Sequence, residues 1–227
     1  MKRNVFFIAF GLVIMIVGGA AISKNLNKKQ DFQKFKEGFD KYNLPFSISD
    51  KDTFKVSNNT LLHSDTTKTR LELGYWGSEI YGSYKEFIPE LKVSSFSREV
   101  TSNCAYVANL YQNTNFTALC YLVSNGFYDS LGEKHFIIAT YNNVSGNRID
   151  KLEFAGQTTP EKYTDGLFAK DNTVTVSSYT KKFKNDPKTT GYDNNSVVAR
   201  ELTGSTSYKL DENGHFGKID ATTVSVK

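Results

Sequence analysis

The sequence predicts an all-β protein, an antiparallel meander forming a sandwich or a curved half-barrel sheet, with one amphipathic helix before it. Strand-length apolar runs rich in Val, Ile, Tyr, Phe and Thr follow one another within residues 104–156. The polar breaks between them are too short for parallel crossovers, so neighbouring strands are expected to be antiparallel. The four runs are Cys104–Tyr111, Phe116–Val123, His135–Tyr141 and Ile149–Phe154.

The run Phe116–Val123 is apolar on both of the faces that a strand would present. Alternation places one set of apolar side chains on one face and a second set on the other. The two sets are Ala118, Cys120 and Leu122, and Leu119, Tyr121 and Val123. Because a strand that is apolar on both sides must be covered on both sides, we expect this strand inside the sheet.

The 227 residues divide into three predicted segments: a signal peptide or membrane anchor over residues 1–23, an amphipathic helix over 24–43, and a single all-β domain over 44–227. A sub-boundary within the β domain is conceivable near residue 100. The N-terminal assignment rests on Lys2 and Arg3, which precede the uncharged run Val5–Ile22. The length of the run favours a retained transmembrane helix, whereas the small residues up to Ala21 suit cleavage.

The orientation of this segment has two interpretations. The lysines just beyond it outnumber Lys2 and Arg3, which by the positive-inside rule indicates a membrane-tethered protein facing the cytosol. A short N-terminal tail and a downstream chain rich in Ser, Thr, Asn and Tyr favour export instead. We expect export, with the membrane as a partner through the N-terminal segment.

The predicted helix carries an aromatic stripe. Phe32, Phe35, Phe39 and Tyr42 recur at intervals of three and four, and Asn43 with Pro45 should end the helix. We expect the stripe to pack on the sheet of the same domain. A partner-binding face is the alternative.

Further elements are predicted beyond the meander. The segment 163–168 is expected to be a loop or weak strand, Thr173–Phe183 a strand, and Val197–Leu210 a strand pair. Residues 211–214 should form a hairpin turn in which Gly214 supplies a positive φ. A final short strand is expected within Lys218–Lys227.

The most aromatic part of the chain is the candidate ligand-binding site. Its rings, Tyr75, Trp76, Tyr81 and Tyr84, lie among glycines that allow sharp turns. Exposed Tyr and Trp faces stack on sugars, so a glycan-binding module is one alternative. A carbohydrate-active enzyme that uses Glu72 and Glu79 is another, and the third is that these rings fill the core.

Cys104 and Cys120 are the two cysteines, and they form a candidate disulfide if the register brings them opposite each other. Otherwise they are two buried thiols. A Cys-His site with His135 is weakly indicated. The sequence has no metal-ligand spacing and no phosphate loop, so no metal and no cofactor is predicted. The net charge of +4, partly carried by Lys2 and Arg3, argues against nucleic acid as a partner.

The predicted helix with Leu44-Pro45-Phe46-Ser47, the central meander and the closing segment 208–216 resemble a group of uncharacterised exported bacterial β-proteins. The resemblance implies an all-β body and a location in the bacterial cell envelope, whether periplasmic, membrane-anchored or secreted. It implies no catalytic residues. We therefore expect an envelope protein with a structural or binding role and a protein or glycan partner, and whether it is also an enzyme stays open.

Overall fold

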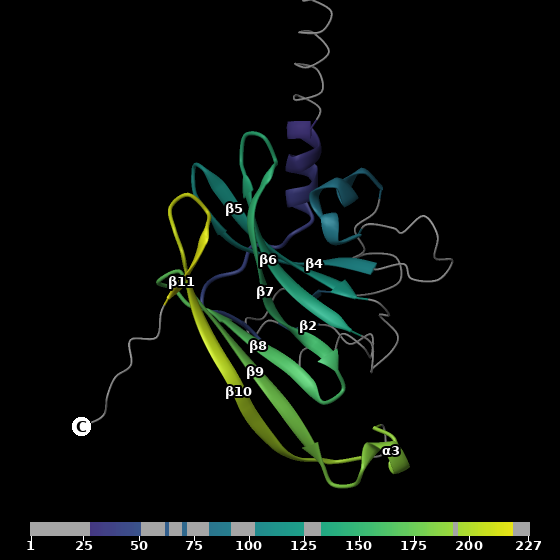
Figure 1. Cartoon of the computed structure of the whole chain (residues 1–227). Helices are drawn as coiled ribbons and strands as arrows, with labels where there is room; N and C mark the ends of the chain where they lie inside the picture. The colour runs from purple at the N-terminus through teal and green to yellow at the C-terminus, as the bar shows by residue number, and fades with distance from the viewer. Residues whose placement is uncertain are drawn as a thin grey trace, which may run out of the picture.

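The computed structural model describes residues 28–50, 62–63, 70–71, 82–91, 103–124, 133–192 and 195–219. Its main feature is one antiparallel sheet with the strand order β11-β10-β9-β8-β7-β6-β5-β4 (Figure 1). Strand β1 pairs with β8 beside this path. Consecutive strands are neighbours throughout, which is the meander that the short connections predict.

The predicted meander corresponds to four strands. They are β4 (Asn103–Gln112), β5 (Phe116–Ser124), β6 (Lys134–Asn142) and β7 (Arg148–Thr159). All nine residues of β5 are buried, which confirms that it is an inner strand covered on both faces. The antiparallel all-β class is therefore confirmed.

The second part of the sheet contains the remaining long strands. They are β8 (Lys162–Phe168), β9 (Thr173–Phe183), β10 (Val197–Leu210) and β11 (Phe216–Ile219). Strand β1 (Phe46–Ile48) pairs with Gly166–Phe168 of β8, whereas β7 pairs with the other end of β8, residues 162–164. Between β9 and β10, the short helix α3 (Pro187–Thr190) lies at the far end of a projecting ribbon (Figure 1).

The first four strands of the meander have an apolar cluster on each face. Phe116, Ala118 and Cys120 of β5 belong to one cluster, which β1 and β8–β10 also enter. Leu119 and Tyr121 belong to the other, which the N-terminal helix and residues 82–91 cover. These residues include the 3-10 helices η1 (Gly82–Phe87) and η2 (Pro89–Leu91).

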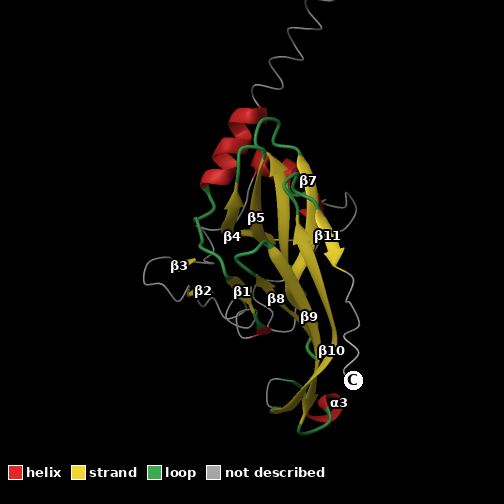
Figure 2. Ribbon diagram, turned by 90° about the vertical axis from the view of Figure 1, so that its left-hand side faces the viewer, coloured by secondary structure: helices red, strands yellow, loops and turns green. Residues whose placement is uncertain are grey.

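The aromatic stripe packs on the sheet of the same domain. The helix covers residues 28–37 and lies to one side of the sheet (Figure 2). Phe32 and Phe35 have no exposed surface, and Phe39 is 4% exposed. Rings of the sheet contact them, as in the 4.8 Å separation between the ring centroids of Phe39 and Tyr106. The packing interpretation is confirmed for Phe32, Phe35 and Phe39, whereas Tyr42 lies beyond the helix and packs against the other cluster.

Three expectations of architecture are corrected. The sheet is open, and the described strands form neither a sandwich nor a curved half-barrel. Val197–Leu210 is one long strand instead of a pair, because β9 lies along almost its whole length. The helix ends at residue 37, earlier than Asn43, because the chain leaves the helical path at Gly38 and then pairs with β4.

The remaining expectations concern the later strands, the turn at Gly214 and the N-terminal segment. The segment 163–168 belongs to the full strand β8, and Gly214 has the expected positive φ of 92° in the β10–β11 turn. The last described strand begins at Phe216, earlier than Lys218. The segment before residue 28 and the sub-boundary near residue 100 lie outside the described residues. Within the described ranges, the structure has no helix with the length and apolarity to cross a membrane.

Candidate functional site

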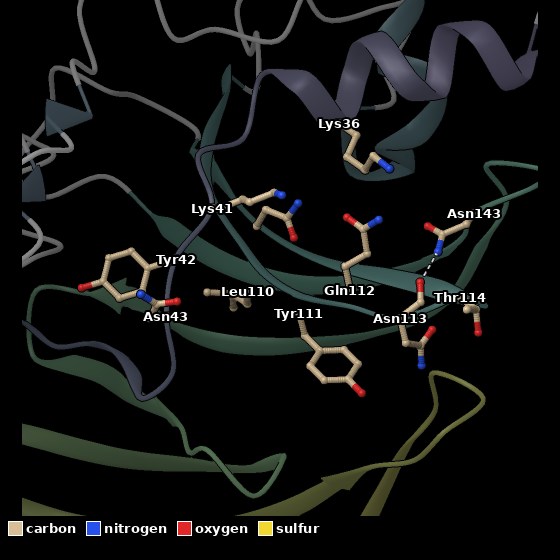
Figure 3. Close-up of a pocket in the computed structure, with 11 residues that line it drawn as sticks. Lys36, Lys41, Tyr42, Asn43, Leu110, Tyr111, Gln112, Asn113, Thr114 and Asn143 are labelled. Atoms are coloured by element: carbon tan, nitrogen blue, oxygen red, sulfur yellow. Dashed lines mark hydrogen bonds between the residues drawn. The ribbon is translucent and has the colours of Figure 1, made fainter.

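A pocket of about 820 Å³ opens between the end of the N-terminal helix and strand β4 (Figure 3). Four parts of the chain line it: the helix, the segment after it, the end of β4 with the β4–β5 turn, and the β6–β7 turn. Its described lining consists of Lys36, Lys41, Tyr42, Asn43, Asn109, Leu110, Tyr111, Gln112, Asn113, Thr114 and Asn143. Because side-chain amides are the commonest groups among these, we call it the amide groove.

Backbone hydrogen bonds hold the segment after the helix against β4. The amide of Asn109 donates to the carbonyl of Asp40 at 2.7 Å, and the amide of Tyr42 donates to the carbonyl of Asn109 at 2.9 Å. Lys41 and Asn109 therefore form a parallel bridge at the outer edge of the sheet. This pairing fixes one wall of the amide groove relative to its floor.

A bulge in β4 decides which side chains face the amide groove. Asn109 lies opposite Leu119, then the register shifts, so that Tyr111 lies opposite Ala118 and Gln112 opposite Thr117. Directly opposed residues point to the same face of a sheet. Asn109 and Gln112 consequently share the face of the N-terminal helix, whereas Tyr111 turns to the other face.

Two of the amides in the lining stabilise the turns beside the pocket through hydrogen bonds. The side-chain oxygen of Asn113 accepts hydrogen bonds from the amides of Asn115 and Phe116, both at 2.8 Å. The side-chain oxygen of Asn143 accepts a hydrogen bond from the hydroxyl of Thr117 at 2.6 Å, and its side-chain nitrogen donates one to the carbonyl of Asn113 at 2.8 Å. These amides hold the β4–β5 and β6–β7 turns together, so their hydrogen-bonding groups are largely committed.

The side chains of the other amides in the lining form no hydrogen bond with a described residue. Asn109 is only 7% exposed, and its side chain makes no hydrogen bond with any described residue. Buried polar side chains normally have a partner, because an unpaired one loses its hydration without compensation. The side chains of Gln112 and Asn43 also have no partner among the described residues, and Gln112 extends from β4 toward the helix that carries Lys36 (Figure 3).

Lys36 and Lys41 give the amide groove a positive end. Neither forms an ion pair with a described residue, and no Asp or Glu is among the described lining residues. Burial and the charge of Lys41 lower the pKa of the Lys36 ammonium, and Glu37 only partly opposes this. The two ammonium groups therefore repel each other across a site that is rich in hydrogen-bonding groups.

Two tyrosines form part of the wall, and the core fixes their rings. The ring of Tyr42 meets that of Phe46 edge-on, with centroids 4.9 Å apart, and the ring of Tyr111 lies 5.6 Å from that of Phe116. Both side chains remain partly exposed. Rings held in this way present a surface at a low cost in side-chain entropy.

No family model, curated protein or solved structure matches this chain. Function is therefore inferred from the residues of the amide groove and from those that the sequence singled out.

The sequence-predicted aromatic site is described only at Tyr84. This residue is partly buried against the helix-side cluster, with its ring 6.0 Å from that of Phe35, and it does not line the amide groove. Tyr75, Trp76 and Tyr81 lie outside the described residues, as do Glu72 and Glu79. The ligand-binding role of these rings stays a prediction.

The two cysteines are free and buried. Cys104 lies opposite Val123, while Cys120 lies opposite Ala108 and belongs to the cluster on the other face. Burial raises the pKa of both thiols, which disfavours the thiolate form that a nucleophile requires. The register therefore selects the interpretation as two buried thiols over the disulfide.

His135, the candidate base, is engaged elsewhere. Its Nδ1 lies 2.8 Å from a carboxylate oxygen of Glu153, and it is paired with Val123 across β5 and β6. The part of the chain that the structure describes holds no cluster of three or more His, Cys, Asp or Glu suited to a metal ion.

Sequence reasoning missed the amide groove, although one signal for it was present. Asn109 is a carboxamide in the middle of an otherwise apolar strand. Such a residue in a buried strand requires a hydrogen-bond partner from outside the strand. No comparable signal existed for Lys36, Lys41 and Gln112, since their convergence depends on the bulge and on the exit of the chain at Gly38.

Proposed function

We propose that this protein is an exported or membrane-anchored component of the cell envelope and that its amide groove binds a glycan. The observation that carries the proposal is the carboxamide of Asn109, which is buried in the lining without a hydrogen-bond partner among the described residues. A ligand that supplies hydrogen bonds would satisfy this group, and the cost of leaving it unpaired in the free protein would be recovered on binding.

The chemistry of the lining suits sugars. Each sugar hydroxyl both donates and accepts hydrogen bonds, and a carboxamide offers two donors beside one acceptor oxygen. Asn43, Asn109 and Gln112 present three such groups in one open pocket. The partly exposed ring of Tyr42, which also lines the pocket, adds apolar surface against which the C–H face of a sugar could pack.

The proposal is for binding and includes no catalytic step. Glycoside hydrolysis normally uses two carboxyl groups that flank the scissile bond. The described lining offers lysines, amides, tyrosines and a threonine, with no carboxyl group to act as acid or nucleophile. Nothing in the amide groove thus motivates a hydrolase.

Export is supported by Lys2 and Arg3 followed by the uncharged run Val5–Ile22. Fractionation of cells that produce the native chain tests it, with protease accessibility of intact cells or spheroplasts as the readout of orientation. We expect the protein in the envelope or the medium. Recovery in the soluble cytosolic fraction would overturn export, and a membrane-bound form protected from external protease would favour the cytosol-facing alternative.

Glycan binding is tested with the full-length chain in detergent on an array of neutral and acidic glycans. The informative variants are Asn109→Leu, which keeps the volume and removes the amide, and Gln112→Ala. Asn185→Ala is the matched control, because it removes an exposed amide near α3, at the other end of the molecule (Figure 1).

We expect at least one glycan to bind, and each groove variant to weaken that binding about three- to tenfold, the equivalent of one hydrogen bond. The control variant should bind like the parent. The proposal is wrong if no glycan binds, or if both groove variants bind as tightly as the parent does.

A further inference from the structure

The residues that the structure describes supply no carboxylate to the positive end of the amide groove. Two partly buried cations elsewhere in the described residues are paired with carboxylates: Lys181 lies 2.5 Å from a carboxylate oxygen of Asp50, and Arg148 lies 2.6 Å from Glu90. Half-buried Lys36 and exposed Lys41 have no such partner among the described residues. Two like charges are thus held on one wall without the anion that normally accompanies them.

The two lysines come from positions that the fold holds in place. Lys36 belongs to the last turn of the helix, which the buried rings of Phe32 and Phe35 fix on the sheet. Lys41 forms the parallel bridge with Asn109. Figure 3 shows both side chains on the helix side of the amide groove, above Gln112. The backbone therefore fixes the positions from which both lysines reach the pocket.

We infer that the ligand of the amide groove is an acidic glycan, and that Lys36 and Lys41 bind its anionic groups while the neighbouring amides bind its hydroxyls. This inference rests on the proposed glycan-binding function. An anion between the ammonium groups would replace their repulsion with two charge-assisted hydrogen bonds, which are about twice as strong as neutral ones. Burial, together with the repulsion that lowers the pKa of Lys36, disfavours the charged form of this group in the free protein, so a bound anion would restore that form.

Carboxylate and phosphate groups are both suitable anions, because a lysine is a point charge with three donors and selects no particular oxyanion. A uronate-containing polysaccharide and a sugar- or polyol-phosphate polymer are therefore two sources of the same chemistry. The amide groove distinguishes both of them from a neutral polysaccharide.

The test uses the full-length chain in detergent and three probes of similar length, studied by calorimetry: an oligogalacturonide, the same oligogalacturonide fully methyl-esterified, and a glycerol-phosphate oligomer. Esterification removes the charge and keeps the sugar. The variants are Lys36→Gln, Lys41→Gln and their combination. Lys34→Gln is the matched control, because Lys34 is exposed on the same helix and does not line the amide groove.

We expect an acidic probe to bind at least about tenfold more tightly than the methyl ester, and the double variant to lose that advantage. The Lys34→Gln variant should retain it. Raising the salt concentration should weaken the binding of the acidic probe and leave that of the methyl ester unchanged. A preference for the glycerol-phosphate oligomer would identify phosphate as the source of charge, and a preference for the oligogalacturonide would identify carboxylate.

If neither acidic probe binds more tightly than the methyl ester, or if the double variant keeps the preference, the inference is wrong. Its failure differs from a failure of the proposed function. If the array yields a neutral glycan whose binding depends on Asn109 and Gln112, the preference for acidic glycans is wrong but glycan binding stands. Both are wrong when no glycan binds at all.

Discussion

The carboxylate of Glu90 accepts a hydrogen bond from the guanidinium of Arg148 at 2.6 Å, which joins the 3-10 helix η2 to strand β7. Lys151 donates to the same oxygen at 2.8 Å, and the hydroxyl of Tyr121 donates to the other oxygen at 3.0 Å. These bonds fasten residues 82–91 over the helix-side cluster, whose sheet residues would otherwise lose part of their cover. A charged group thus helps to close an apolar core.

This carboxylate predicts a defined dependence of stability on pH. Burial favours a raised pKa for Glu90, but the hydrogen bonds from Lys151 and Arg148 outweigh it and lower the pKa from 4.5 to about 2. Because the folded pKa is depressed, the contribution is complete above pH 4.5 and is lost as pH falls toward 2. At roughly 1.4 kcal/mol per pKa unit, it amounts to about 3 kcal/mol.

Urea unfolding between pH 2.5 and 7 measures this contribution in the Glu90→Gln variant. The variant should lose about 2 to 3 kcal/mol near neutral pH and converge on the parent in acid. Glu201→Gln is the control, because Glu201 pairs with Lys182 while 53% of its side chain is exposed, and it should change stability by less than about 1 kcal/mol. A constant difference between Glu90→Gln and the parent across this range would contradict the assignment.

The sequence predicts the meander well because its physical signals are local. The run around Leu119 is apolar on both faces over eight residues, and no other environment than an inner strand suits such a run. The stripe of Phe32, Phe35 and Phe39 is equally local, since helical periodicity alone places the rings on one face. Both predictions needed only neighbours in the chain.

The amide groove could not be predicted in this way, because distant contacts create it. One inserted residue between Asn109 and Tyr111 reverses which side chains face the helix, and no local pattern marks a bulge there. The fate of the cysteines likewise depends on the pairing register, which places Cys104 opposite Val123 and Cys120 opposite Ala108. The pairing of β1 with β8 is also a relation between residues more than 100 positions apart.

Leu119→Asp should destabilise the protein by about 3 to 5 kcal/mol, because it buries a carboxylate with no partner in an inner strand. Leu119 has no exposed surface and lies in the helix-side cluster. Leu202→Asp is the matched control, since Leu202 is 59% exposed on β10 and should change stability by less than about 1 kcal/mol. Thermal unfolding measures both, and a similar loss in the two variants would show that β5 is not central.

Gly214→Ala should also destabilise, by about 1 to 3 kcal/mol, through backbone strain and contact together. Gly214 has a φ of 92°, and an added Cβ would lie 3.1 Å from the ring of Phe116 and 3.2 Å from Ile149. Its carbonyl oxygen also accepts a hydrogen bond from the hydroxyl of Thr140 at 2.6 Å, and this bond restrains the turn. A Cβ added at Gly204 would have no heavy atom within 4 Å, so Gly204→Ala should leave the free energy of unfolding unchanged or raise it. Urea unfolding of both variants measures the difference.

The two kinds of amide in the groove predict opposite effects on stability. Asn143 connects Thr117 and Asn113, and Thr117 is fully buried, so Asn143→Leu leaves a buried hydroxyl unpaired. We expect a loss of about 2 to 4 kcal/mol in the free energy of unfolding. The carboxamide of Asn109 has no hydrogen-bond partner to lose in the part of the chain that the structure describes, and Asn109→Leu replaces it by an apolar group of similar shape. Its free energy of unfolding should stay unchanged or rise by about 1 kcal/mol.

Such a gain at Asn109 would have a specific meaning when combined with weaker glycan binding. A residue that costs stability in the free protein and contributes to binding behaves as a binding-site residue does, because the fold leaves its hydrogen-bonding capacity unused. Urea unfolding of Asn109→Leu and Asn143→Leu side by side measures the contrast. A loss of stability at Asn109 as large as that at Asn143 would show that its carboxamide supports the fold, and the amide groove would then lose the observation on which its proposed role rests.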